Sequence, residues 1–291
     1  MGVREVSRRT GAALVLGGSL GLVAGCGGGA SPAATTATVA GPAVLHVVFP
    51  EGFTRAQMAR RLTAVRAIAR SSRGITPRLT AGAYLTATGS SPLPGRFAGD
   101  GKRRSLEGFL FPATYEFFSD ETARSFVRRQ LEAFTDAWST VDLRYARSKN
   151  LTAYDVLIIA SMIEREVVVP RERRLVAAVI YNRLHRRMPL GIDATLRYGL
   201  GIPPTRAITK AELASDSPYN TRRHLGLPPT PIANPGLASI EAAAHPARVG
   251  YLYFVRKPDC RSHYFTASEA EFLSYSRAGL RCSQGKLVSS G

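Results

Sequence analysis

The chain has 291 residues, of which 45% are hydrophobic and 21% charged. This balance excludes a disordered or fibrous protein, and the length allows one large domain or two medium ones with a buried core. The formal net charge of +18 indicates a polyanionic neighbour such as nucleic acid, anionic lipid or an acidic cell-wall polymer.

The N-terminus predicts an export signal. Three arginines form a basic start, and the apolar run that follows, of about 15 residues, is short for a membrane span but typical of a signal peptide. The run ends in VAGC, which resembles the lipobox of bacterial lipoproteins. We therefore expect residues 1–25 to be removed, Cys26 to be lipidated, and residues 26–44 to form a flexible tether. An uncleaved N-terminal helix with an incidental cysteine is the alternative.

Both alternatives predict a location on the extracytoplasmic face of the bacterial cell membrane, with a lipid or an N-terminal helix as the anchor. Removal of residues 1–25 takes away three arginines and one glutamate and leaves a net charge of +16. An exported protein does not normally meet DNA, so no nucleic-acid partner is expected. The basic surface is expected to face anionic lipid or an acidic wall.

Beyond Cys26 the chain has only two cysteines, Cys260 and Cys282. In an oxidising compartment they predict a disulfide that closes a loop of about 20 residues and contributes about 3 kcal/mol. Two free thiols are the alternative. No Cys/His spacing indicates a metal site, and we expect neither a metal nor a cofactor.

A small αβ module is predicted over residues 45–95. AVLHVVFPEG predicts a strand that ends in a Pro-Glu-Gly turn. The spacing of Met58, Leu62 and Val65 after Thr54, a good N-cap residue, predicts a helix. LTAGAYLTATG favours a second short strand. The module is too small to suggest catalysis, and a loop rich in Gly, Pro and Arg follows it.

The second part, residues 105–291, is denser in apolar residues. Helices are predicted over about 120–137 and 152–169, and Pro170 ends the second of these and begins another. Beyond residue 188 turns and prolines dominate, until YLYFVRK and SHYFTAS predict a hairpin. The fold class is therefore α+β: a small αβ module followed by a mixed helical and β domain.

Two carboxyls, Glu164 and Glu166, stand at the end of the apolar run of the 152–169 helix. Both faces of that helix are apolar, so periodicity does not tell which glutamate is buried. A carboxyl among apolar side chains has a raised pKa, because desolvation penalises the charged form, and a general acid needs this property near neutral pH. A structural ion-pair network with the arginines at 171–174 is the alternative, and the residues alone slightly favour it.

Four separated segments match one family in order. They are LEGFLFPATYEF, ASMIEREV…ERRLVAAVIYNRL…MPLGIDATLRYGLG, DSPYNTRRHLGLPPTPIANPG and AAAHPA…YLYFV…HYF, and they cover about residues 105–272. Together they resemble the endolytic murein transglycosylases of the MltG (YceG-like) family. The resemblance implies cleavage of the MurNAc–GlcNAc bond within nascent peptidoglycan strands, with 1,6-anhydro-MurNAc ends. It makes residues 105–291 the catalytic domain and residues 45–95 a partial LysM-like module, and peptidoglycan synthases become candidate partners.

The resemblance also implies roles for individual residues. The single catalytic glutamate falls on Glu164, which acts as acid and then as base, and Glu166 is a supporting residue that replaces it if this assignment is wrong. For the other polar residues of these motifs, which are listed next, the alternative role is structural, as helix caps or turn residues. The residues of the matching motifs that are expected to support the reaction or bind the glycan are Asn182, Asp193, Thr195, Tyr198, Ser217, Tyr219 and Asn220.

The chain departs from the family pattern around Asp193. The family usually has a polar pair before this aspartate and a proline after it, whereas this chain has Gly191, Ile192 and Ala194. Two other functions therefore stay open. One is a non-catalytic wall-binding scaffold, which the altered loop favours, and the other is a lysozyme-type muramidase, which would leave reducing ends.

Overall fold

The computed structural model describes residues 41–89, 91–95, 97 and 103–278. The predicted signal peptide, the predicted lipidation site at Cys26, nearly all of the tether, and Cys282 lie outside these residues. Among the helices of the described residues, none has the length and apolar character needed to cross a bilayer.

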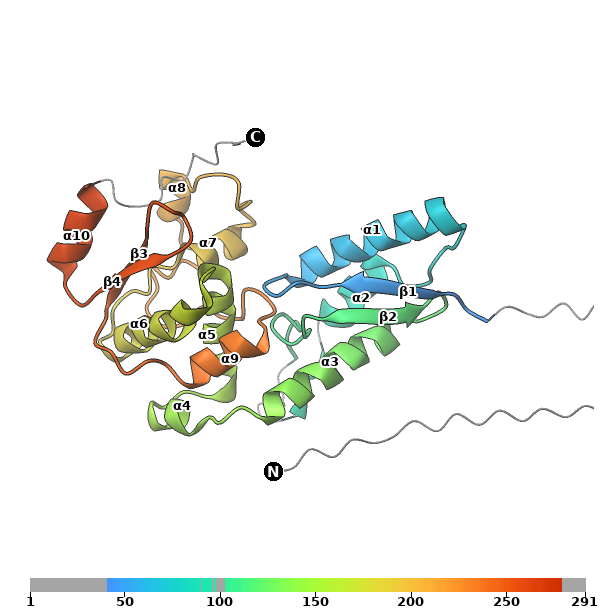
Figure 1. Cartoon of the computed structure of the whole chain (residues 1–291), viewed down its shortest axis with the longest axis horizontal. Coiled ribbons are helices and arrows are strands. Elements are labelled where there is room, and N and C mark those ends of the chain that lie inside the picture. The colour runs from blue at the N-terminus through green and yellow to red at the C-terminus, as the bar shows by residue number, and fades with distance from the viewer. Residues whose placement is uncertain (1–40, 90, 96, 98–102, 279–291) are drawn as a thin grey trace, which may run out of the picture. The chain divides into compact units, whose positions relative to one another are not determined.

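The N-terminal part is built from β1 (Val44–Val48), α1 (Arg55–Arg73), α2 (Ala81–Gly89), β2 (Thr114–Phe118) and α3 (Ala123–Ser139). The strands β1 and β2 pair antiparallel, with Val47 opposite Tyr115. In the view of Figure 1, α1 is drawn above these two strands and α3 below them. In both strands exposed and buried residues alternate, so the sheet buries one face. Because β2 lies beyond residue 105, the pairing joins the predicted 45–95 module to the second part of the chain.

The buried face of this sheet packs on an aromatic cluster. Phe49, Tyr84 and Phe126 are at most 1% exposed, and their ring centroids lie 6.1–6.4 Å apart. The Tyr84 hydroxyl donates to Gln130 Oε1 at 2.8 Å, so its polar end is satisfied inside the core.

The segment LTAGAYLTATG forms helix α2, and the prediction of a strand there was wrong. The helix begins after Thr80, whose side chain accepts the Ala83 amide at 3.2 Å and whose carbonyl accepts the Tyr84 amide at 3.0 Å. Tyr84 and Thr88, one turn apart, are fully buried. Packing of this one helical face outweighs the β propensity of tyrosine and threonine.

The C-terminal part surrounds one apolar helix. Its elements are α4 (Arg144–Ser148), α5 (Ala153–Glu166), a 3₁₀ turn (Pro170–Glu172), α6 (Arg173–His185), α7 (Asp193–Leu200), α8 (Lys210–Leu213), α9 (Leu237–Ala244), β3 (Tyr253–Arg256), β4 (His263–Thr266) and α10 (Glu269–Arg277). Every residue of α5 from Val156 to Ile163 is buried, and the helix packs against α6, α7 and α9. The predicted hairpin is confirmed as β3–β4, and the α+β class is confirmed.

The end of α5 depends on the proline that follows it. The predicted helix reached residue 169, but Val167 is already extended, with φ −95° and ψ 122°. The chain then remains extended at Val169, immediately before Pro170, because a residue before proline is disfavoured in the helical region. Glu164 and Glu166 therefore lie on the last turn of α5.

A buried amide, Asn234, joins the two parts of the structure. Its Oδ1 accepts the backbone amides of Gly108 and Leu110, both at 2.9 Å. Its Nδ2 donates to the Phe53 carbonyl at 2.8 Å and to Glu107 Oε1 at 2.9 Å. Asn234 is fully buried, so each of these contacts is made in the absence of competing water.

The carboxyl of Glu107 extends the same network. It is 2% exposed and accepts the Arg55 amide at 3.0 Å, which is one of the free donors of the first turn of α1. It also accepts the Tyr198 hydroxyl from α7 at 3.2 Å. Burial raises the pKa of Glu107 to about 7, although these hydrogen bonds act in the opposite direction.

Glu107 should make stability depend on pH. Since the pKa of this carboxyl rises from 4.5 to about 7 on folding, its contribution is fully present below pH 4.5 and is lost as the pH rises to about 7, by about 3 kcal/mol. Urea unfolding between pH 4 and 8 measures this loss, and Glu107→Gln should remove it. The control Glu132→Gln changes a 63% exposed side chain on α3 and should keep the wild-type slope. An unchanged slope in Glu107→Gln would contradict the assignment.

Candidate active site

The two glutamates at the end of α5 point in different directions. Residues two apart on an α-helix are separated by about 200° around its axis. Glu164 therefore faces the Pro-Glu-Gly turn after β1 and the start of α9, whereas Glu166 faces α7 and the β3–β4 hairpin. Arg165 lies between them and donates to the Gly52 carbonyl at 3.2 Å.

Glu164 is half-buried and lies against two glycines. Its Oε2 accepts the backbone amide of Gly236, the N-cap residue of α9, at 3.1 Å. A side chain at Gly52 would place its Cβ 3.5 Å from Glu164 Cγ. Glu51, the residue before Gly52, reaches the same place, because a Cβ on Gly236 would fall 1.8 Å from Glu51 Oε1.

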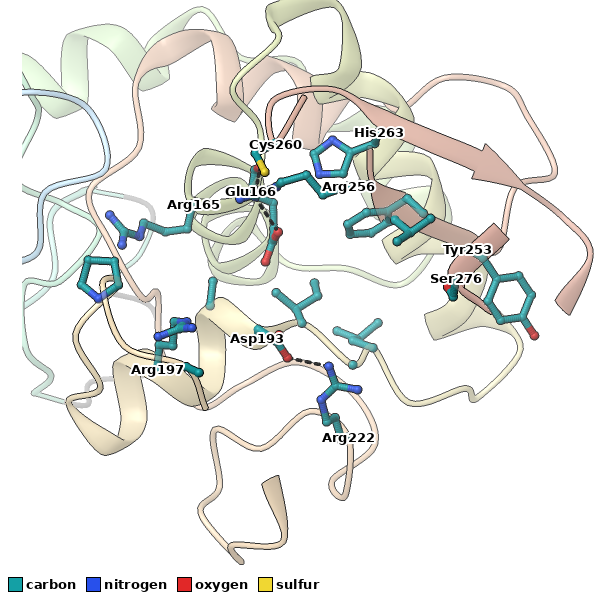
Figure 2. Close-up of a pocket in the computed structure, with 18 of the residues that line it drawn as sticks. Arg165, Glu166, Asp193, Arg197, Arg222, Tyr253, Arg256, Cys260, His263 and Ser276 are labelled. Atoms are coloured by element: carbon teal, nitrogen blue, oxygen red, sulfur yellow. Dashed lines mark hydrogen bonds and ion pairs between the residues drawn. The ribbon is translucent and has the colours of Figure 1, made fainter. Parts of the chain in front are cut away.

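Glu166 points into a cavity, toward Asp193 (Figure 2). Its side chain is 14% exposed, and its Oε2 lies 3.6 Å from Nη2 of Arg256, which also donates to the Glu166 carbonyl at 3.0 Å. Burial raises the pKa of Glu166 and the Asp193 carboxylate raises it further, while Arg256 and the Ala194 amide lower it. The desolvation that raises the pKa of a buried carboxyl thus acts on Glu166.

The cavity has a volume of about 1170 Å³ and lies between the end of α5, the start of α7 and the β3–β4 hairpin. Glu166 lines it and Glu164 does not. Three acidic side chains line it (Glu166, Asp193 and Asp259), and six arginines outnumber them: Arg165, Arg183, Arg197, Arg206, Arg222 and Arg256. This surplus of positive charge in a concave site favours acidic ligands.

Asp193 is the first residue of α7 and forms an ion pair with Arg222 on the cavity wall (Figure 2). Burial lowers the pKa of Arg183, and the nearby Arg222 guanidinium adds to this effect. Arg183 donates to the carbonyls of Leu252 and Pro189 at 2.6 and 2.9 Å. It is thus held in place by neutral acceptors, and its positive charge contributes to the field of the cavity.

A buried pair fixes the hairpin beside the cavity. Nδ1 of His263 lies 2.7 Å from Glu172 Oε2, and the backbone amide of the same histidine donates to Oε1 at 3.1 Å. Burial lowers the pKa of His263, and Glu172 opposes that shift. Glu172 belongs to the 3₁₀ turn after Pro170, so the pair ties β4 to the segment that follows the two glutamates.

The alternative interpretation of these glutamates, an ion-pair network with the arginines at 171–174, is not found among the described residues. Among the described residues, Glu166 pairs with Arg256 instead. Arg173 donates to Ser239 Oγ at 3.2 Å and Arg174 donates to the His245 carbonyl at 2.7 Å. These two hydrogen bonds connect the first turn of α6 to α9 and to its C-cap residue.

The other predicted site residues of the matching motifs make hydrogen bonds within the protein. Asn182 donates through Nδ2 to the carbonyls of Val249 and Tyr251, at 2.9 and 2.8 Å, and so holds the chain that leads into β3. Thr195 is fully buried and donates to the Ile192 carbonyl at 2.7 Å. These hydrogen bonds position the segments on either side of the cavity.

Residues of the SPYN segment also make internal contacts. Asn220 is fully buried and donates to the carbonyls of Leu213 and Ser215, at 3.0 and 2.8 Å, and Ser217 accepts the Tyr219 amide at 3.3 Å. The rings of Tyr219 and Tyr198 meet edge to face at 5.3 Å. Of the predicted supporting residues, only Glu166 and Asp193 line the cavity.

Sequence reasoning missed several residues around the two glutamates. Arg256 lies in the predicted hairpin strand YLYFVRK, and Glu107 lies in the motif LEGFLF, but neither was singled out. Glu51 was treated only as part of a turn. The sequence does contain one signal for Glu51, a carboxyl in a turn directly after a buried strand, although nothing in it shows which helix that turn contacts.

Cys260 lines the cavity and is disulfide-bonded. Its predicted partner, Cys282, lies outside the described residues. Within the part of the chain that the structure describes, no group of three or more His, Cys, Asp or Glu side chains is arranged to hold a metal ion.

A model of the YceG-like family matches residues 28–278, and the chain belongs to this family. The chain is also similar to two proteins named endolytic murein transglycosylase. It is 39% identical over 155 residues to the one from Bacillus subtilis (strain 168), which covers 53% of this chain and 43% of that protein. It is 32% identical over 231 residues to the one from Streptococcus pneumoniae (strain ATCC BAA-255 / R6), with 74% and 41% covered. The chain thus spans less than half the length of these relatives.

The fold is similar to that of a solved structure. The crystal structure of a yceG-like protein from Listeria monocytogenes matches with a TM-score of 0.64 and 29% sequence identity. The match covers 79% of this chain and 75% of that one, so it includes both parts described above.

Asn182 gives a test of the internal contacts. Asn182→Ala should lower the free energy of unfolding by about 2 kcal/mol, because two carbonyls lose their donor. Asn182→Asp keeps the size but replaces both donors with a carboxylate oxygen that the two carbonyls repel, so it should cost more than Asn182→Ala. Urea unfolding measures both variants. Unchanged stability together with weaker glycan binding would instead make Asn182 a substrate-binding residue.

Proposed function

We propose that this protein is a lytic transglycosylase that cleaves the MurNAc–GlcNAc bond within nascent peptidoglycan strands and leaves 1,6-anhydro-MurNAc ends. Membership of the YceG-like family and the names of its relatives support the proposal. The observation that carries it is the last turn of α5, where a buried apolar helix presents Glu164 beside the Gly236 amide and Glu166 to an arginine-rich cavity.

One carboxyl is enough for this reaction. Protonated Glu164 donates its proton to the glycosidic oxygen, and the bond between that oxygen and C1 of MurNAc breaks. The resulting carboxylate then takes the proton of the C6 hydroxyl of the same MurNAc as O6 bonds to C1. No water is consumed, so the second carboxylate of hydrolytic glycosidases is not required. Polar groups nearby stabilise the positive charge that develops on the sugar ring.

The surroundings of the two glutamates support this division of roles. The Glu166 carboxyl is already engaged by the Arg256 guanidinium and by the start of α7. Among the described residues, the Glu164 carboxyl has one hydrogen-bond donor, the Gly236 amide, which leaves its other oxygen open to substrate. The raised pKa of Glu166 is the observation in favour of the opposite assignment, with Glu166 as the acid.

The cavity suits the acidic character of peptidoglycan. The glycan carries carboxylates on its peptide substituents, and arginine binds carboxylates through paired N–H donors. Six arginines against three acidic side chains provide such donors close to Glu166. Asp193 and its ion-pair partner Arg222 line the same cavity, and we assign them to binding of these substituents.

Product analysis tests the proposal. Wild-type protein incubated with uncrosslinked glycan strands should release fragments with 1,6-anhydro ends in mass spectrometry, and Glu164→Gln should lower their rate about 10²- to 10⁴-fold, as loss of a general acid does. Glu132→Gln is the control and should keep the wild-type rate. Activity that survives Glu164→Gln but is lost in Glu166→Gln would move the acid by two residues. Reducing ends would indicate a muramidase, and no cleavage of any strand would favour a wall-binding scaffold.

The location is part of the proposal. We assign the protein to the extracytoplasmic face of the cell membrane, with a lipid on Cys26 as the anchor, and we keep peptidoglycan synthases as candidate partners. Cys26→Ser should release the protein from the membrane fraction, because the lipid is attached through this thiol. Immunoblotting of membrane and soluble fractions measures the change. Retention of the Cys26→Ser variant in the membrane would favour an uncleaved N-terminal helix.

The LysM-like character is predicted for residues 45–95, which contain α1, α2 and nearly all of β1. Its role in binding glycan stays a proposal. Because its Pro-Glu-Gly turn lies against Glu164, any glycan held by this part would be held next to the site of cleavage.

A further inference from the structure

Glu51 is a second carboxyl at the place where Glu164 is held. Glu51 belongs to the N-terminal part, 113 residues before Glu164, and both side chains reach Gly236. Oε2 of Glu164 is 3.1 Å from the Gly236 nitrogen, and Oε1 of Glu51 is 1.8 Å from the position of a Cβ on the same residue. Only a residue without a side chain leaves Glu51 in this position.

The two carboxyls are close enough to interact. Since neighbouring backbone atoms are about 1.5 Å apart, these two oxygens lie within about 8 Å of each other even if they approach Gly236 from opposite sides. Like charges at such a distance repel each other, so an ionised Glu164 opposes ionisation of Glu51. In agreement with this, partial burial and then Glu164 raise the pKa of Glu51, while Arg173 lowers it.

The backbone holds this arrangement in place. The Gly52 amide donates to the Asn234 carbonyl, and the Asn234 amide donates to the Phe53 carbonyl, both at 2.9 Å. Arg165 adds its hydrogen bond to the Gly52 carbonyl. The turn that carries Glu51 is therefore fixed to the loop before Gly236 by contacts on both sides.

We propose that Glu51 is a positioning residue for Glu164. Its carboxyl keeps a proton on the pair at neutral pH, so that Glu164 can act as the acid. This inference rests on the proposed function. The charged groups that face the pair are Arg165 at the end of α5 and Arg173 at the start of α6. Both are cations that favour ionised carboxyls, and Glu51 counteracts them. The N-terminal part thus completes the active site of the C-terminal part.

The pH profile of cleavage tests this role. Full-length protein is assayed on uncrosslinked strands from pH 4.5 to 9, and kcat/KM should fall on the alkaline side as the pair loses its proton. Glu51→Gln removes the like charge, so the alkaline limb should move to lower pH, and a shift of one unit lowers the rate about tenfold on that side. Glu51→Asp keeps the charge and should restore most of the wild-type profile.

Two further variants make the result specific. Gly236→Ala places a methyl group where the Glu51 carboxyl lies and should move the limb in the same direction without removing a carboxyl. Glu116→Gln, a 70% exposed glutamate on β2, should leave the profile unchanged. An alkaline limb that stays at the wild-type pH in both Glu51→Gln and Gly236→Ala, or a loss of rate that is equal at every pH, would overturn the proposal.

Carboxyl titration gives a readout that does not need cleavage. In protein labelled with ¹³C at the glutamate carboxyls, the Glu164 signal should titrate at lower pH in Glu51→Gln than in wild type. The same midpoint in both proteins would overturn the role of Glu51. Absence of cleavage by wild-type protein would contradict the proposed function, whereas the titration would still report whether the two carboxyls interact.

Discussion

The contact between Asn234 and Glu107 is the constraint on which the rest of the structure depends. The amide of Asn234 satisfies the backbone of the LEGFLF segment and the Phe53 carbonyl, and Glu107 holds the first turn of α1 and the Tyr198 hydroxyl. Both side chains are buried, so loss of either would leave polar groups unsatisfied inside the protein. This network fixes the turn after β1 against the loop before α9, and the candidate acid lies where these two segments meet.

Electrostatics then separates the two glutamates of α5. Helical geometry directs them to different faces, and each face supplies a different environment. Glu166 meets Arg256 and Asp193 at the wall of an arginine-rich cavity. Glu164 meets the Gly236 amide and a second carboxyl, Glu51. The proposed mechanism assigns substrate binding to the first environment and proton transfer to the second.

Much of the fold was predictable from local pattern. The apolar run of α5, the spacing in α1 and α3 and the alternation in β1 are local signals that match the structure, because each of these elements buries one regular face or is buried almost entirely. The error at α2 has a clear cause. Its tyrosine and threonines favour strands locally, and only the contact of Tyr84 with Phe49 and Gln130 makes the helix the better solution.

The candidate site was predictable only in part. Glu164, Glu166 and Asp193 stand in contiguous motifs, and these can be matched from sequence. Glu51 and Arg256 come from segments far away in the chain, and hydrogen bonds between Asn234 and the backbone of residues 52 and 53 hold the Pro-Glu-Gly turn beside the loop before α9. No periodicity encodes such a long-range contact. Likewise, Asn182 and Asn220 have the composition of sugar-binding residues, and their hydrogen bonds to backbone carbonyls are visible only in the structure.

The most direct test of Glu164 as the acid is a crystal structure of the Glu164→Gln variant with an uncleaved glycan strand. We predict that the scissile glycosidic oxygen lies within about 3 Å of the side chain of residue 164, beside Glu51, with acidic groups of the strand among the arginines of the cavity. A strand whose glycosidic oxygen lies against Glu166, with residue 164 out of reach, would contradict it.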